Sequence, residues 1–260
     1  MAAIFAAAPP GCASRAARPL PPSMWKADAT PTPRRVPYLA TVFQRVGWSQ
    51  VAIASGAIVH SCPEHGTYVL TAYHAVDESS RPGVWVYAHG RKGARGDEED
   101  TLLFGADIVY PPEEDLGWGT LGKLNDLFRD MEITLSRDFA LLKLRNRETF
   151  QPVPIHSRTD KNLPDGTPVQ LGAVSPEMFP HFHEFAWSFE YPPEVFQEGH
   201  SGGPILLEGA LFAIVASALG DSTIVLQRPT VPEMRAHLVK AGLGFVLSER
   251  SCGGHPPRTK

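Results

Sequence analysis

The sequence lacks long apolar runs and lacks an excess of charge of one sign. No stretch of about 18 or more apolar residues occurs, so no segment is expected to span a membrane as a helix. The formal net charge at pH 7 is −4, with 24 basic and 28 acidic residues. Such a balance gives no broad basic field for holding a phosphate backbone or an anionic lipid surface. We therefore expect no nucleic-acid partner and no membrane attachment.

Cysteine is also scarce. The chain has only Cys12, Cys62 and Cys252, an odd number at unrelated spacings without a Cys-x-x-Cys or Cys/His metal signature. The pattern predicts no disulfide framework. Because secreted proteins often depend on several disulfides, it favours a reducing, cytoplasmic compartment, with a secreted or periplasmic location as the alternative.

The first 35 residues lack hydrophobic periodicity and are rich in Ala, Pro and Arg. This composition predicts a disordered leader over residues 1–35, with the folded part beginning near Val36. The short apolar stretch near the start has no basic residue ahead of it and is closed early by prolines, so it matches a signal peptide poorly.

Short apolar runs bounded by Gly, Pro, Asp and Ser follow, which is typical of the strands of an all-β sandwich or barrel. The predicted strands are Gln50–Val59, Tyr68–Thr71, Gly83–Tyr87, Phe139–Leu144, Val169–Val174, Leu211–Ala216 and Thr223–Gln227.

Three stretches depart from this β pattern. Residues 91–100 are charged and predict a hairpin tip or loop. Apolar residues at helical spacing predict a short inserted helix over 120–131. Thr230, a proline in the first turn and Glu233 form a helix-start signature, so a C-terminal helix is expected over 230–241.

The most informative motif is Gly199-His-Ser-Gly-Gly-Pro204. Glycines permit close backbone approaches, so the amides of Gly199 and Ser201 could point at one spot and stabilise a carbonyl oxygen that gains negative charge. Ser201 is then the candidate nucleophile. The alternative interpretation is a Gly-Gly-Pro turn that contains an incidental serine.

A serine hydroxyl needs a neighbouring base, and that base needs a carboxylate to orient it. His74 ends the apolar segment Tyr68–Val76 in a turn of small residues, and Asp138 opens the apolar strand that ends at Leu144. Each also has a structural interpretation: a histidine whose hydrogen bonds the backbone satisfies, and an aspartate in a strand-initiating turn.

In the order His74, Asp138, Ser201, these segments resemble the trypsin-like, chymotrypsin-fold serine peptidases, in a compact, disulfide-poor bacterial form. The resemblance implies an all-β peptidase domain of two six-stranded antiparallel Greek-key barrels that meet at a cleft. It also implies peptide-bond hydrolysis through an acyl-enzyme, without a cofactor. The expected units are barrel 1 over 36–147, barrel 2 over 148–229 and the helix over 230–241, within a domain 36–245 that a tail 246–260 follows.

The resemblance also implies substrate-binding residues. Val195 lies where this family places the base of the primary specificity pocket; with no acid there, small or medium apolar side chains are favoured over Lys or Arg. Ala216, Ser217 and Ala218 correspond to the strand edge that binds an extended peptide.

Several histidines do not fit a simple role. His200 stands where digestive and clotting members of the family carry aspartate, so zymogen activation is not expected and a solvent-facing structural histidine is the preferred interpretation. His181 and His183 share a strand face that suits zinc but lack a third ligand, so no metal site is predicted. His60 and His65 flank Cys62, and we interpret them as a hairpin surface.

Two alternatives to a peptidase remain at this point. A catalytically silent or latent module could keep the peptide cleft, or the same triad could serve an esterase. A peptide or protein substrate is expected, and control by a separate regulatory protein is a hypothesis only.

Overall fold

The computed structural model describes thirteen segments of the chain, namely residues 38–46, 50–76, 84–92, 99–111, 138–145, 149–160, 162–174, 180–187, 190–191, 199–216, 218–219, 224–226 and 229–248. The predicted leader and the predicted helix over 120–131 lie outside these residues. No helix in these segments is long and apolar enough to cross a membrane.

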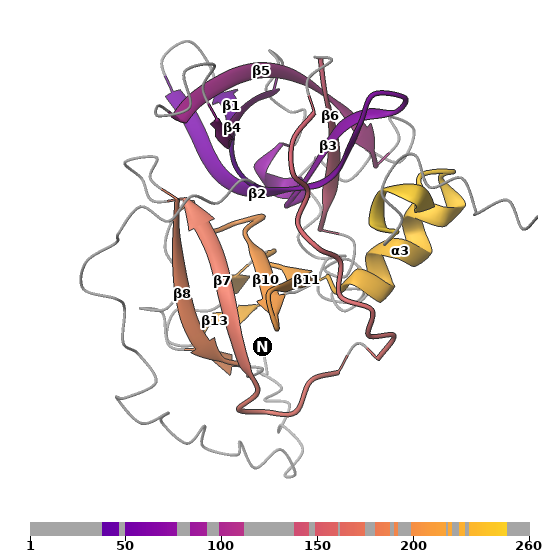
Figure 1. The fold of residues 1–260 in the computed structure, drawn as a ribbon. Coiled ribbons are helices and arrows are strands. Elements are labelled where there is room, and N and C mark those ends of the chain that lie inside the picture. Colours follow the sequence, from indigo (N-terminus) through magenta and orange to yellow (C-terminus); the bar gives the residue numbers. More distant parts are fainter. Residues whose placement is uncertain are drawn as a thin grey trace, which may run out of the picture.

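The first half of the chain forms a closed antiparallel barrel, drawn in indigo to magenta in Figure 1. Its strands pair in the order β1-β2-β3-β6-β5-β4. Their bounds are β1 Leu39–Val46, β2 Gln50–Cys62, β3 Gly66–Thr71, β4 Val84–Lys92, β5 Glu99–Tyr110 and β6 Ala140–Leu144. The all-β prediction and the first six-stranded barrel are confirmed.

Neighbouring side chains along the barrel strands belong to two different buried clusters. Ile58 in β2 and Val69 in β3 belong to the buried cluster that also contains Val42 and Val86. Their neighbours Ala57 and Leu70 belong to another cluster, which includes residues of the second half of the chain. Successive side chains of a strand point to opposite faces, so each strand fills the barrel and covers its outside at once.

The charged stretch 91–100 begins and ends in strands. Arg91 pairs with Asp100 and Lys92 with Glu99, at the ends of β4 and β5. Residues 91–92 and 99–100 belong to the paired ends of β4 and β5, so the predicted hairpin tip or loop is narrower than 91–100. Residues 93–98 lie outside the described part. Strand β5 itself was not predicted.

The second half contains two sheets in the described residues. A four-stranded sheet has the order β11-β10-β7-β8 and a three-stranded sheet the order β12-β13-β9. The strands are β7 Pro168–Val174, β8 Pro180–Ala186, β9 Glu190–Tyr191, β10 Pro204–Leu207, β11 Ala210–Ile214, β12 Ala218–Leu219 and β13 Ile224–Leu226. The predicted second six-stranded barrel is not confirmed, since the hydrogen bonds of these strands do not close into one sheet.

The predicted C-terminal helix is confirmed as α3, Val231–Lys240. The carboxylate of Glu233 accepts hydrogen bonds from the backbone N–H and the hydroxyl of Thr230, which satisfies the start of the helix. A 3₁₀ helix, η7 (Gly244–Leu247), follows and carries buried Val246 and Leu247. The packed structure therefore extends past residue 245, the end of the expected domain.

One apolar cluster holds the parts together. It joins the outer face of the barrel, including Leu70 and Leu141, to Leu206 and Ile214 of the four-stranded sheet and to Met234 of α3. Figure 1 shows α3 beside the β3 and β6 side of the barrel. Because residues from both halves of the chain share this buried cluster, the two halves pack against each other.

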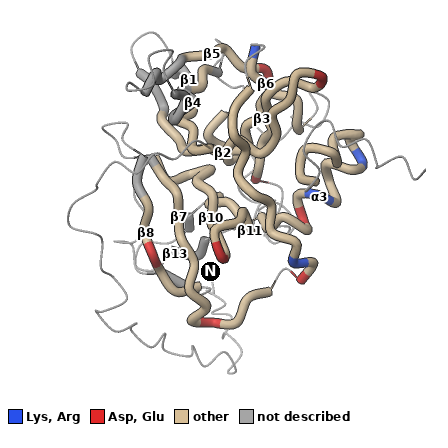
Figure 2. The backbone as a smooth tube through the Cα atoms, viewed as in Figure 1, with Lys and Arg blue, Asp and Glu red and all other residues tan. Residues whose placement is uncertain are grey.

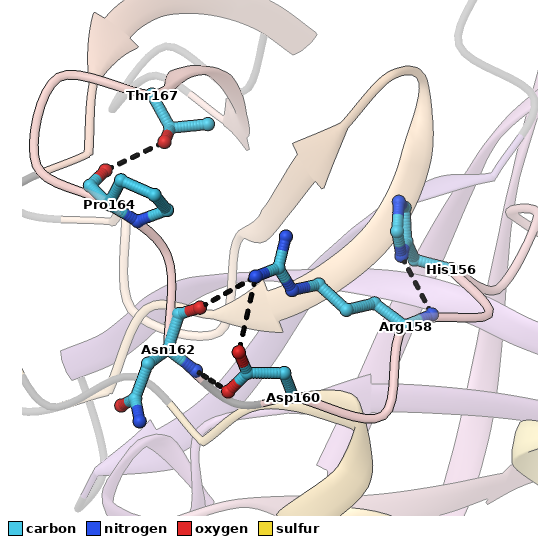
Figure 3. Close-up of polar contacts among 6 residues, drawn as sticks. All are labelled: His156, Arg158, Asp160, Asn162, Pro164 and Thr167. Atoms are coloured by element: carbon cyan, nitrogen blue, oxygen red, sulfur yellow. Dashed lines mark hydrogen bonds and ion pairs between the residues drawn. The ribbon is translucent and has the colours of Figure 1, made fainter.

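The segment between β6 and β7, residues 149–167, is the connector between the two halves, and several polar contacts hold it (Figure 3). The guanidinium of Arg158 donates to the carboxylate of Asp160 at 3.3 Å and to the carbonyl of Asn162 at 3.0 Å. The Asp160 carboxylate also accepts from the Asn162 N–H. The hydroxyl of Thr167 donates to the carbonyl of Pro164 just before β7.

Figure 2 shows acidic and basic residues scattered over both halves in this view.

Cys62, at the end of β2, corrects one prediction. It is disulfide-bonded, whereas the odd number and unrelated spacing of the cysteines led us to expect no disulfide framework. The other cysteines, Cys12 and Cys252, both lie outside the described residues. Sequence spacing does not reveal disulfide connectivity. The cysteine count therefore no longer favours a reducing compartment.

Candidate active site

Ser201 lies in a tight turn between Gly199 and the start of β10. Gly199 and Gly202 have φ angles of 93° and 80°, in the left-handed region that side chains other than glycine rarely adopt. The turn is fastened to β2, since the hydroxyl of Ser55 donates to the Gly199 carbonyl at 2.7 Å and the Ser55 N–H donates to the Ser201 carbonyl at 2.8 Å.

Gly202 is required by space as well as by conformation. A Cβ at this position would lie 2.2 Å from the Ser55 carbonyl oxygen and 2.3 Å from the Thr71 hydroxyl. The Gly202 N–H donates to the Val215 carbonyl, and the Val215 N–H donates to the Gly203 carbonyl. The turn is thus packed against β2 and β3 on one side and held by the end of β11 on the other.

His74 and Asp138 meet because two neighbouring strands end together. In the antiparallel pair β3–β6, Thr71 lies opposite Ala140. The chain leaves β3 into a 3₁₀ turn, Tyr73–Ala75, which carries His74, and Asp138 lies two residues before Ala140. One residue follows a strand end and the other precedes the adjacent strand start, so both lie at the same end of the barrel.

The three side chains form a continuous hydrogen-bonded chain. Oδ2 of Asp138 is 2.8 Å from Nδ1 of His74, and Oδ1 accepts from the His74 backbone N–H at 2.9 Å. Nε2 of His74 is 2.9 Å from Oγ of Ser201. A carboxylate only accepts, so Nδ1 carries the ring proton and Nε2 of the neutral imidazole is left to accept from the Ser201 hydroxyl.

Asp138 and His74 differ in their exposure to solvent, and this difference affects the pKa of His74. The Asp138 residue is 8% exposed, whereas the side chain of His74 is 41% exposed. Burial lowers the pKa of His74, but the hydrogen bond and the negative charge of Asp138 outweigh it, so that the pKa lies above the ordinary histidine value. The carboxylate therefore makes His74 a stronger base than an isolated imidazole.

Two backbone amides of the turn, those of Gly199 and Ser201, have no acceptor among the described residues. Within the described segments, the amides of Gly199 and Ser201 donate no hydrogen bond, whereas those of Gly202 and Gly203 bond the carbonyls of Val215 and His200. An amide pair next to a nucleophile with no internal acceptor can serve an anionic oxygen.

The predicted substrate-binding residues are placed only in part. Ala216 is buried directly after β11. Ala218 opens β12, an edge strand whose one partner in the described residues is β13. Ser217 and Val195 lie outside the described part of the chain.

Two interpretations of histidines need correction. His200 does not face solvent: it is 2% exposed, and its ring lies 5.6 Å from that of His183. Its backbone carbonyl accepts a hydrogen bond from the Gly203 N–H. His60 is likewise no hairpin surface, because it is 6% exposed and packs edge-on against Tyr68 and Phe245.

Ser55 and Thr71 are the site residues that the sequence analysis did not identify. The hydroxyl of Thr71 donates to the Ser55 carbonyl at 2.8 Å, and Ser55 in turn bonds the turn that carries Ser201. Both are fully buried polar residues inside predicted strands. A hydroxyl in an apolar strand indicates that it has a hydrogen-bond partner, but the sequence does not identify that partner.

No protein-family profile matches the sequence, and no curated protein matches it. Among solved structures, the chain is similar to the active form of the Rv3671c protease from Mycobacterium tuberculosis. The TM-score is 0.49 at 18% sequence identity, and the alignment covers 84% of this chain and 86% of that chain. At this distance, the function has to be judged from the geometry of the site.

Proposed function

We propose that this chain is a serine endopeptidase of the trypsin-like type. The observation that carries the proposal is the hydrogen-bonded chain from Asp138 through His74 to Ser201, with links of 2.8 and 2.9 Å. A carboxylate, an imidazole and a hydroxyl in this order form the arrangement that activates a serine. Their order along the chain, His74, Asp138, Ser201, is that of the chymotrypsin type.

In the proposed reaction, Nε2 of His74 takes the proton of Ser201 as its Oγ attacks the substrate carbonyl. The resulting oxyanion accepts hydrogen bonds from the amides of Gly199 and Ser201, each worth about 3 kcal/mol of barrier. His74 then passes the proton to the leaving amine, and an acyl group remains on Ser201. Water deprotonated by His74 releases the acyl group and restores the enzyme.

Asp138 acts on His74 in this scheme and remains an acceptor throughout. Its two oxygens bond the ring Nδ1 and the backbone N–H of His74, which fixes both the tautomer and the direction of the ring. The same carboxylate stabilises the imidazolium that forms while His74 holds the proton.

A peptide substrate is favoured over a simple ester by strand β12, which within the described residues lies at the edge of its sheet and begins three residues after Val215, whose carbonyl accepts from Gly202 in the turn of Ser201. Strand β12 begins at Ala218, two residues after Ala216, and lies at the edge of its sheet. An extended peptide can add to such an edge through its main chain, which a small ester cannot do.

The test is hydrolysis of a diverse peptide mixture and of matched esters by the purified chain. We expect peptide cleavage at internal bonds, lost about a million-fold in Ser201→Ala. Ser248→Ala, which removes a hydroxyl bonded to the Phe245 carbonyl, is the matched control and should leave cleavage unchanged. Hydrolysis of esters alone would indicate an esterase, and cleavage that persists in Ser201→Ala would contradict the proposal.

A further inference from the structure

Three side chains with metal-ligating atoms converge at the β2–β3 hairpin, away from Ser201. They are His60 and Cys62 near the end of β2 and His65 in the turn that follows. One ligand atom from each residue, a ring nitrogen of each histidine and the sulfur of Cys62, lies within 4.8 Å of the other two. The proposed reaction uses none of them.

The two sulfur–nitrogen distances fit a tetrahedral metal. Sγ of Cys62 is 3.4 Å from Nε2 of His60 and 3.6 Å from Nδ1 of His65. Zinc bonds of ~2.3 Å to sulfur and ~2.0–2.1 Å to nitrogen at tetrahedral angles place a ligating S and N about 3.5 Å apart. Both sulfur–nitrogen separations therefore already match those of a bound zinc ion.

The surroundings hold two of these ligands and leave a way in. The ring of Phe245, from η7, lies 5.2 Å from that of His60 and 4.6 Å from that of His65. Cys62 is 2% exposed, whereas His65 is exposed. An ion can thus arrive from the solvent side at His65 and meet a buried thiolate and imidazole, with a fourth position for water.

The disulfide at Cys62 sets a condition on this site. A thiolate ligates zinc strongly, whereas a sulfur already bonded in a disulfide has no thiolate charge to offer. We propose that His60, Cys62 and His65 form a zinc site in the reduced protein, and that disulfide formation at Cys62 excludes the metal.

The exchange balances with a dithiol reductant. The reductant gives two electrons and two protons to the disulfide, becomes a disulfide itself, and leaves Cys62 and its partner as thiols. Zinc then binds as the Cys62 thiol releases its proton to solvent. Oxidation by a small-molecule disulfide runs the other way: this oxidant takes two electrons and two protons and becomes a dithiol, the sulfurs of Cys62 and its partner are joined again, and the zinc ion is released.

Cobalt(II) is the probe for the first test, since thiolate ligation gives an intense charge-transfer absorption. In the full chain with Cys12→Ser and Cys252→Ser, Cys62 is the one remaining thiol. We expect this variant to bind about one Co²⁺ with a thiolate band and without any reductant, and added Zn²⁺ to abolish the band. Adding Cys62→Ser should remove it. Absence of a thiolate band from the first variant and from the reduced parent would overturn the proposal.

Two matched substitutions on the same background separate ligation from stability. His65→Asn should weaken Zn²⁺ binding at least tenfold in a chelator competition. His156→Asn makes the same exchange at a half-buried histidine in the connector, whose Nδ1 accepts from Arg158, and should leave the affinity unchanged. Equal affinities for the two variants would contradict ligation by His65.

The parent chain tests the redox condition. After reduction it should bind about one Zn²⁺, and the oxidised chain should bind at least a hundredfold more weakly. Equal binding by the two forms would contradict exclusion by the disulfide. Because none of these measurements reads hydrolysis, failure of the zinc site leaves the proposed peptidase activity standing, and the reverse also holds.

Discussion

The hydroxyl of Ser55 donates a 2.7 Å hydrogen bond to the carbonyl of Gly199, across 144 residues of sequence. The same residue donates its N–H to the Ser201 carbonyl. One buried serine of the barrel therefore fixes both ends of the turn that carries the candidate nucleophile. The site depends on this contact between the two halves of the chain.

Ser55→Ala should reduce both stability and activity. The substitution leaves the buried Gly199 carbonyl without this donor, which costs about 1–3 kcal/mol of unfolding free energy. It also loosens the turn, so kcat should fall. Ser61→Ala, in the same strand, removes a hydroxyl that accepts from the Phe150 N–H and should cost stability without lowering kcat. Equal effects of the two variants on kcat would contradict a positioning role for Ser55.

Gly202→Ala should abolish activity, because the added Cβ would overlap the Ser55 carbonyl oxygen at 2.2 Å and the Thr71 hydroxyl at 2.3 Å. Gly209 is the matched control, with φ of 79° and nothing within 4 Å of its added Cβ. Gly209→Ala should cost only the left-handed conformation, about 1–2 kcal/mol, and keep full kcat. Thermal unfolding and peptide hydrolysis measured on both variants check this; an active Gly202→Ala would contradict the packing described for the turn.

In the pH profile of hydrolysis, the midpoint of the acidic limb should lie at a pH above the ordinary pKa of histidine. Activity requires neutral His74, whose pKa is raised, so kcat/KM should increase as the pH rises through that pKa. The contribution of His74 to folding stability decreases over the same rise in pH. The interaction with Asp138 stabilises the fold most below the unfolded histidine pKa, and this contribution is lost as the pH rises through the folded pKa.

Asp138→Asn should move that acidic limb to lower pH and lower kcat about ten-thousandfold. The amide removes the negative charge that raises the pKa of His74 and no longer selects the tautomer with the proton on Nδ1. The measurement is kcat/KM against pH for the parent and the variant. An unmoved limb would show that the limb belongs to another group.

Thr230→Ala should affect stability alone. The residue begins α3 and bonds the Glu233 carboxylate through its hydroxyl, and loss of such an N-terminal cap costs about 1 kcal/mol. The site lies elsewhere, so kcat should equal that of the parent. Denaturant unfolding measures the first effect and peptide hydrolysis the second; a loss of kcat at full stability would connect α3 to the site in a way not described above.

Four strands of the first barrel, β2, β3, β4 and β6, and the candidate residues His74, Asp138 and Ser201 were predictable because their signals are local, whereas β1 and β5 were not predicted. Short apolar runs bounded by turn residues indicate β2, β3 and β6, and His74 and Asp138 stand at the ends of such runs. Strand β5 escaped because Glu99, Asp100 and Asp107 interrupt its apolar pattern with charge. The stretch therefore resembled a loop in the sequence.

Other features depend on pairing that no local pattern encodes. The two-residue strands Glu190–Tyr191 and Ala218–Leu219 are too short to show periodicity, so the number and closure of the sheets in the second half could not be judged. Ser55 needed a partner 144 residues away to acquire its role. Likewise, neither the burial of His200 nor the disulfide at Cys62 follows from sequence spacing.

Labelling with a fluorophosphonate probe at neutral pH, followed by mass-spectrometric mapping of the modified residue, tests the central claim most directly. Such probes bond covalently to a serine hydroxyl that a neighbouring base activates. We predict one adduct per parent chain, on Ser201, and none in Ser201→Ala or His74→Ala. A parent chain that takes no label, or takes it at a residue other than Ser201, would contradict the assignment of the catalytic serine.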